Sequence, residues 1–181
     1  MKISDSEKLI LLMLSDLYDA TGVQGEIDPD FIRAAVLNDK AWSIPWKYSG
    51  IPFSEDETPA IVEEVLDILE MWSVIEESYS RLSPEDKSRI ETEASPFGKE
   101  PKFRGFDGNN ESEHMSTASF LVNKLDRFEE FKGRSFNSHS RVIDVYQRML
   151  PKFEKMRANF PLNHNQIVEL LNSQIHPDHQ K

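Results

Sequence analysis

The segment from 59 to 81 constrains the fold most strongly, because its apolar residues recur at the spacing of an α-helix. Seven of them lie three or four positions apart and would share one helical face: Ile61, Val65, Ile68, Leu69, Trp72, Ile75 and Tyr79. A proline in the first turn, as in Thr58-Pro59, favours a helix start. The segment therefore predicts a long helix whose apolar face needs other elements packed against it.

Cap residues and apolar periodicity predict six further helices: 5–20, 29–39 capped by Asp28, 84–93 capped by Ser83, 110–131 capped by Asn109 or Asn110, 139–156 capped by Ser138 and 164–171 capped by Asn163. The first can be capped by Ser4 or Asp5 and stopped by Gly22. Its apolar run covers every side, so we expect it to be buried between other helices. Pro151 falls inside a helical pattern and is expected to kink or divide that helix.

The lack of strand patterns in the sequence also indicates the fold class. No stretch alternates polar and apolar residues for long enough to indicate a strand. We predict an all-α fold, a single compact bundle of about six to eight helices over residues 1–173, followed by a flexible tail at 174–181. Residues 40–57 give no clean period and form an irregular aromatic segment within that domain.

Charge and composition disfavour several classes of function. Lys and Arg total 21 against 32 Asp and Glu, a net charge of −11, so binding to nucleic acid or to an anionic membrane is not expected. The absence of cysteine excludes disulfides, thiolate nucleophiles and cysteine zinc sites. The longest apolar run, 9–14, is too short for a membrane span and too acidic around it for a signal peptide. We expect a cytoplasmic protein.

The candidate site is the loop 103–111, together with Asn137, Ser138 and His139. The loop holds two glycines, two phenylalanines, paired amides and two carboxylates within nine residues. In a structural interpretation Phe103 and Phe106 fill the core, the glycines supply positive φ, and the polar side chains bond local backbone N–H groups. We favour this interpretation.

The functional interpretation places two helix N-termini side by side, at Asn109 or Asn110 and at Ser138, which would suit an anionic ligand. In an enzyme, His139 would be the general base and Asp107 would orient it. The ligand-binding candidates combine the two segments with two arginines that could add positive charge: Phe106, Asp107, Asn109, Asn110, Glu111, Asn137, Ser138, Arg127 and Arg148.

No metal or cofactor is predicted. The alternation of Asp107, Asn109 and Glu111 resembles the start of an EF-hand, but the glycine and final glutamate of that loop are missing. Glu111 and His114 have the Glu-x-x-His spacing of dinuclear sites in helical bundles, but no second such pair exists. Glycine-rich nucleotide loops are also absent.

The aromatic segment offers a different kind of site. Trp42, Trp46, Tyr48 and Phe53 could form an exposed patch, and aromatic residues are common anchors of protein interfaces. The alternative is a flap packed over the helices, which we favour because large aromatic residues are usually buried.

Four runs of sequence resemble the YfbU family of bacterial proteins: RGFDGNNE at 104–111, RF at 127–128, NSH at 137–139 and YQRML at 146–150. Residues 9–11 and 65–71 are similar in kind and order, so the resemblance extends from the first helix to the last. The segment 40–53 and the tail have no counterpart in it. The resemblance implies a helical fold and a bacterial cytoplasmic setting, and it brings no established activity.

Two functional hypotheses follow. The first is a non-enzymatic interaction or regulatory protein that self-associates or binds a protein partner through the aromatic segment or a helical face. The second is a small-molecule binder or enzyme with its site between 106–111 and 137–139. We favour the first, because no catalytic constellation is complete.

Overall fold

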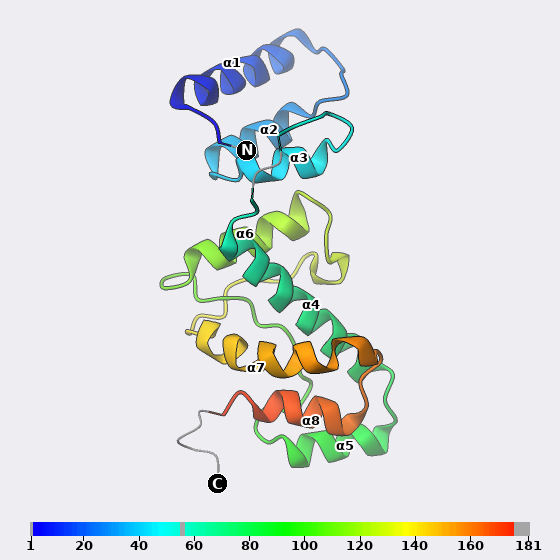
Figure 1. Cartoon of the computed structure of the whole chain (residues 1–181). Coiled ribbons are helices and arrows are strands. Elements are labelled where there is room, and N and C mark those ends of the chain that lie inside the picture. The colour runs from blue at the N-terminus through cyan, green and yellow to red at the C-terminus, as the bar shows by residue number, and fades with distance from the viewer. Residues whose placement is uncertain (1, 55–56, 176–181) are drawn as a thin grey trace. The chain divides into compact units, whose positions relative to one another are not determined.

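The computed structural model describes residues 2–54 and 57–175, which form eight α-helices and three short 3₁₀ helices (Figure 1). The fold is all-α, as the sequence predicts. In the described residues the only strand-like feature is an isolated bridge between Phe106 and Asn137. No helix of this part of the chain is long and apolar enough to cross a membrane.

The chain divides into two compact units, Met1–Ala60 and Ile61–Lys181. That both belong to a single domain over 1–173 stays a prediction. Gln174, the first residue of the predicted tail, is buried, and its carbonyl accepts a hydrogen bond from Arg148 at 2.8 Å. The last six residues of that tail lie outside the described residues.

The first unit begins with a helix that has both of its predicted ends. Helix α1 (Asp5–Thr21) starts with a capping box between Ser4 and Glu7 and stops at Gly22, whose φ of 64° is left-handed. Helix α2 (Pro29–Leu37) is capped by the Asp28 carboxylate, as predicted. The 3₁₀ helix η1 (Ala41–Ser43) and helix α3 (Ile44–Lys47) follow within the aromatic segment.

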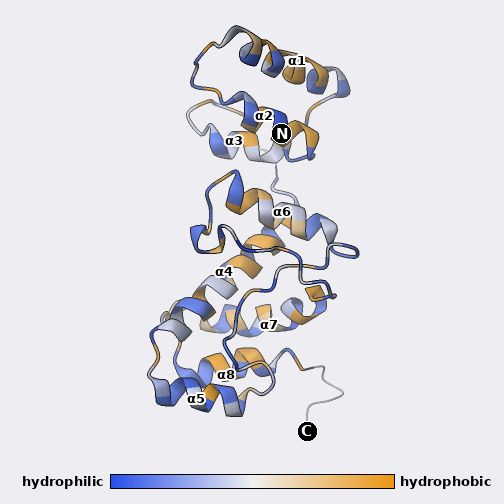
Figure 2. Cartoon of the chain, turned by 180° about the vertical axis from the view of Figure 1, so that it is seen from behind, coloured by the Kyte–Doolittle hydropathy of each residue, from blue (hydrophilic) through white to orange (hydrophobic). Residues whose placement is uncertain are grey.

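Helix α1 differs from expectation in its burial. It packs on α2, and Ser15 is its one buried residue among those described. Five large apolar side chains on its other side are 48–64% exposed: Leu9, Ile10, Met13, Leu14 and Leu17. Hydrophobic residues run along the whole helix in Figure 2. The expectation of a helix buried between other helices therefore does not hold within the first unit.

The second unit is organised around α4 (Ala60–Ser80), the helix predicted from its apolar face. Val65, Ile68, Leu69 and Ile75 on that face are fully buried. Helices α5 (Pro84–Glu93) and α8 (His164–Asn172) pack together and begin at the predicted caps, Ser83 and Asn163. Helix α7 (Ile143–Met156) packs on α8 and leads into the 3₁₀ helix η3 (Arg157–Asn159).

Two predicted features of the second unit are wrong, and one of the two alternatives for Pro151 is excluded. The helix predicted over 110–131 is shorter: α6 (Ser112–Asn123) ends first, and the 3₁₀ helix η2 (Glu129–Phe131) follows it. Between them Asp126 and Phe128 have φ of 55° and 53°, which is incompatible with a continuing helix. Ser138 does not cap α7, which begins five residues later. Helix α7 continues through Pro151 undivided, and the kink at this residue stays a prediction.

Candidate functional site

The structure brings the two segments of the candidate site together. The backbone N–H of Phe106 donates to the carbonyl of Phe136 at 2.8 Å, and the N–H of Ser138 donates to the carbonyl of Phe106 at 2.9 Å. These bonds form the bridge between Phe106 and Asn137, hereafter the clasp. The clasp is non-local and could not be derived from the spacing of the two segments.

Glycines allow the close approach of the two segments. Gly105 has a φ of 84°, and a Cβ at this position would lie 2.2 Å from the carbonyl oxygen of Phe136. A Cβ on Gly108 would lie 2.8 Å from the side-chain nitrogen of Asn137. Gly105 therefore needs its lack of a side chain both for its backbone conformation and for the clasp.

The Asp107 carboxylate accepts hydrogen bonds from other residues of the loop. Asp107 is buried, and its Oδ1 accepts from the backbone N–H of Asn109 at 3.1 Å. Its other oxygen accepts from the side-chain amide of Asn110. The bond from Asn110, and after it the bond from Asn109, hold the pKa of Asp107 below its ordinary value. This arrangement matches the structural interpretation of the loop.

Glu111 has a role that sequence reasoning missed. It is buried, and its Oε2 accepts from the N–H of Asp107 at 2.8 Å. Its Oε1 accepts from the N–H groups of Val142 and Ile143, at 2.8 and 2.9 Å. Because α7 has no side-chain cap from its own sequence neighbours, Glu111 caps it from 31 residues away.

The Asn137 side chain joins the same network. Its Oδ1 accepts from the N–H of Gly108 at 3.1 Å and from the N–H of His139 at 2.9 Å. His139 is exposed and has a φ of 55°. The Ser138 hydroxyl donates to the carbonyl of Ser140 at 2.6 Å. The two predicted segments are thus brought together, and the side chains of Asp107, Glu111 and Asn137 accept hydrogen bonds from backbone N–H groups within and next to them.

The arginine at this loop is not one of the two predicted from the sequence. Arg141 donates to the side-chain oxygen of Asn110 at 2.8 Å. Arg148 instead points its guanidinium toward the carbonyl of Gln174, at the end of α8. Arg127 is exposed just after α6. Arg141 falls inside the helix predicted over 139–156, so nothing in the sequence placed its side chain at the loop.

Aromatic residues of the core pack against the residues of the loop. The ring of Phe103 lies 5.7 Å from that of Phe106, 5.3 Å from Phe131 and 6.0 Å from Tyr146. The Tyr146 hydroxyl donates to the carbonyl of Gly105 at 3.1 Å, and burial raises its pKa. Phe103 and Phe106 therefore fill the core, as the structural interpretation expects.

No metal site accompanies this network. In residues 2–54 and 57–175, no group of three or more His, Asp or Glu side chains could hold a metal ion. His114, which shares the Glu-x-x-His spacing with Glu111, is instead 2.9 Å from a carboxylate oxygen of Glu64.

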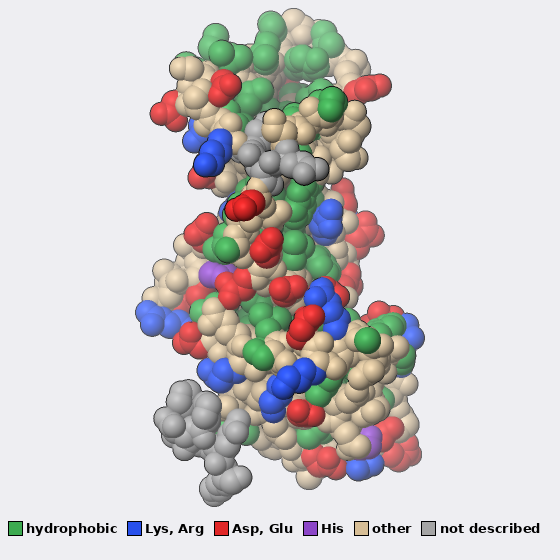
Figure 3. Space-filling view, in the orientation of Figure 1, with side chains coloured by type: hydrophobic (Ala, Val, Ile, Leu, Met, Phe, Trp, Pro, Cys, Tyr) green, Lys and Arg blue, Asp and Glu red, His purple; other side chains and the backbone are tan. Residues whose placement is uncertain are grey.

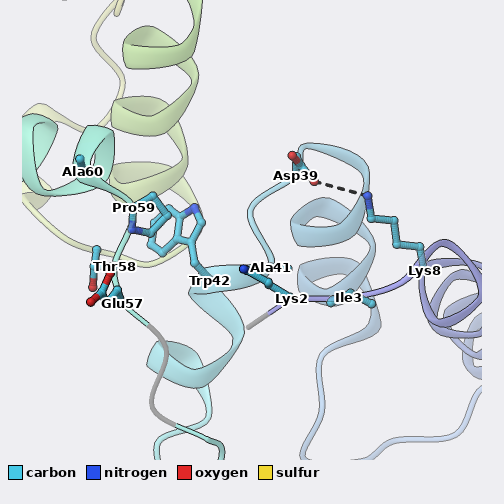
Figure 4. Close-up of a pocket in the computed structure, with 10 residues that line it drawn as sticks. All are labelled: Lys2, Ile3, Lys8, Asp39, Ala41, Trp42, Glu57, Thr58, Pro59 and Ala60. Carbon is cyan, nitrogen blue, oxygen red and sulfur yellow. Dashed lines mark hydrogen bonds and ion pairs between the residues drawn. The ribbon is translucent and has the colours of Figure 1, made fainter.

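The aromatic segment lies half-buried in the first unit. The rings of Trp42 and Trp46 meet edge to face at 5.0 Å. Tyr48 packs against Phe31 at 5.9 Å, and its hydroxyl accepts from the N–H of Asp28. Trp42 also lines an open pocket of about 900 Å³ beside the ion pair of Lys8 and Asp39, as Figure 4 shows.

An apolar groove of about 350 Å³ lies beside α1. Its lining combines residues of α1, α2, α3 and the aromatic segment: Lys2, Ile3, Glu7, Ile10, Leu11, Ile27, Ile32, Ile44, Tyr48, Ile51 and Phe53. Ile10 belongs both to this groove and to the exposed face of α1. Two of the predicted interface residues, Tyr48 and Phe53, therefore border an apolar surface larger than the aromatic segment alone.

The fold and the loop define an all-α protein with a glycine-rich loop that is clasped to the segment before a later helix. The family description "YfbU domain" matches residues 32–173, most of the chain. The chain belongs to the YfbU family. A comparison with curated proteins finds no match to it.

The family match differs in extent from the resemblance in the sequence at two places. It includes residues 40–53, which the resemblance in the sequence left without a counterpart. It does not include α1, which contains the similar residues 9–11. The exposed helix of the first unit therefore lies outside the matched region.

Proposed function

We propose that this YfbU protein is a non-enzymatic interaction or regulatory protein of the bacterial cytoplasm, which acts by binding another protein chain. The observation that carries the proposal is the exposed apolar face of α1, formed by Leu9, Ile10, Met13, Leu14 and Leu17 and hereafter the α1 stripe. Contiguous apolar patches of this kind mark interaction sites in soluble proteins.

The clasped loop supports the proposal indirectly. The carboxylates of Asp107 and Glu111 and the amide of Asn137 accept hydrogen bonds from nearby backbone N–H groups. Groups used in this way hold the fold together and are not directed at a substrate. The α1 stripe, in contrast, has an adjoining groove that can receive an apolar side chain from a partner.

The experiment compares capture of proteins by tagged full-length chains. Met13→Glu places a charge at the centre of the α1 stripe, and Leu37→Glu makes the same change at a residue that is 65% exposed on α2. We expect wild type and Leu37→Glu to retain a bound protein chain that Met13→Glu loses. Equal capture by all three, with nothing specific to the stripe, would exclude this function.

A second candidate function is a small-molecule site at the clasped loop, with Asp107 and His139 as its polar groups. One observation favours it: the clasp joins the loop to Asn137, so the exposed His139 follows within two residues. Screening anionic ligands by thermal shift against wild type and His139→Ala tests it. A ligand that stabilises only the wild type would support a site, and a set of ligands with no differential effect would count against it.

A further inference from the structure

The α1 stripe has a simple internal symmetry. Leu9, Met13 and Leu17 are spaced four residues apart, with Ile10 and Leu14 alongside them. Residues three or four apart share one helical face, so these side chains form a continuous strip on the side of α1 away from Ser15. Hydrophobic side chains are visible over α1 in the space-filling view of Figure 3.

This symmetry makes the strip complementary to itself. A twofold axis through Met13 and perpendicular to α1 would set a second α1 antiparallel to the first. Leu9 of one copy would then face the partner's Leu17, and Met13 would face the partner's Met13. Closed twofold pairing of one patch with itself is the commonest form of protein oligomer.

The size of the strip also fits a second copy. Its five half-exposed side chains form a patch on the order of 500 Å². Two such patches pressed together bury on the order of 1,000 Å², the area at which specific interfaces begin. The groove beside Ile10 adds room for partner side chains at the edge of the strip.

We infer that the α1 stripe is covered by a second copy of this chain, in a twofold dimer of antiparallel α1 helices. The inference rests on the proposed function and names its partner. A dimer of this kind places residue 13 of both copies on the axis, so a charge introduced there meets the same charge from the partner.

The test uses sedimentation equilibrium of the full chain with charges of either sign at residue 13. We expect wild type and Leu37→Glu to have twice the 20.9 kDa of one chain at tens of micromolar. Met13→Glu and Met13→Lys should each be monomeric, with dissociation constants raised at least tenfold. An equimolar mixture of these two variants should recover a dimer, because opposite charges then meet on the axis. Circular dichroism checks that both remain helical.

Two results would overturn the inference. One is a wild type that stays monomeric up to 100 µM, and the other is a mixture that recovers no dimer. If the chain is monomeric but Met13→Glu still loses a different captured protein, the second copy is excluded and the proposed function stands. If the chain is monomeric and the stripe captures nothing, both are excluded.

Discussion

At the scale of single residues, Glu111 joins the loop of the second unit to the start of α7. Its buried carboxylate joins the N–H of Asp107 to the N–H groups of Val142, just before α7, and of Ile143, the first residue of α7. Burial of a charged group is costly unless all its hydrogen bonds are made, so each of these three bonds matters.

Replacing Glu111 by alanine is therefore expected to cost about 3 kcal/mol of unfolding free energy, because two buried N–H groups and one part-buried N–H group lose their acceptor. Glu111→Gln keeps one acceptor oxygen and should lose about half as much. Urea unfolding measures both. The control is Glu113→Ala, an exposed neighbour, which should change stability by less than about 0.5 kcal/mol. Similar losses at 111 and 113 would contradict the capping role.

The lowered pKa of Asp107 predicts how the stability of the fold depends on pH. Its folded-state pKa is lowered by Asn110 and Asn109 from the ordinary value of 3.8, so its stabilisation is present above that value. It is lost as the pH falls through the lower pKa of the folded state. Asp107→Asn should therefore be less stable than wild type at pH 7, and the difference should shrink as the pH falls below 3.8. Urea unfolding at pH 7, 5 and 3 tests this, and a constant difference would contradict it.

At the scale of elements, the sequence predicts helix starts well where the cap lies beside its helix. Ser4, Asp28, Ser83 and Asn163 each cap the helix that the sequence assigns to them. The predicted start of α7 was wrong, because the residue that caps this helix, Glu111, is far from it in the sequence. Local sequence reports local hydrogen bonding, and it holds no information on a bond that depends on chain reversal.

The candidate site shows the same limit. Its core-filling phenylalanines and its local Asp107 bonds follow from residue type and spacing. The clasp to Asn137, the cap by Glu111 and the contact of Arg141 depend on two segments meeting, which spacing cannot reveal. The α1 stripe was missed for another reason. An apolar helix indicates that its faces are covered, but it does not specify which chain covers them.

Gly105 and Gly133 both have a positive φ, but only Gly105 lies at the clasp. Substitutions at the two positions therefore separate the cost of backbone strain from the cost of disturbing the clasp. Gly133 has a φ of 77° with nothing within 4 Å of a Cβ, so Gly133→Ala should cost about 1–2 kcal/mol. Gly105→Ala meets the same strain and also the Phe136 carbonyl, so it should cost clearly more. Thermal or urea unfolding measures the difference. Equal losses of stability in the two variants would show that the clasp adjusts to a Cβ at residue 105 with no further loss of unfolding free energy.

At the scale of the whole molecule, charge sets how self-association responds to salt. Each chain has a net charge of −11, so two copies repel one another at low ionic strength. The α1 stripe itself is apolar and is not weakened by screening.

We therefore expect the dimer to tighten as salt rises from 50 to 500 mM, because the Debye length shortens to a few ångströms. Sedimentation equilibrium at several salt concentrations measures this trend, with Leu37→Glu as the control. Weaker association at high salt would indicate an interface held by opposite charges, in contradiction to pairing through an apolar strip.

The cap of α7 by Glu111 also determines the order in which parts of the second unit fold. The N–H groups of Val142 and Ile143 gain their acceptor only when Glu111 arrives from the other side of a thirty-residue stretch of chain. Closing such a stretch is slower than extending a helix that has already started. The middle of α7 can therefore form early, while its first turn waits for the clasp and is among the last parts of the second unit to become protected from hydrogen exchange.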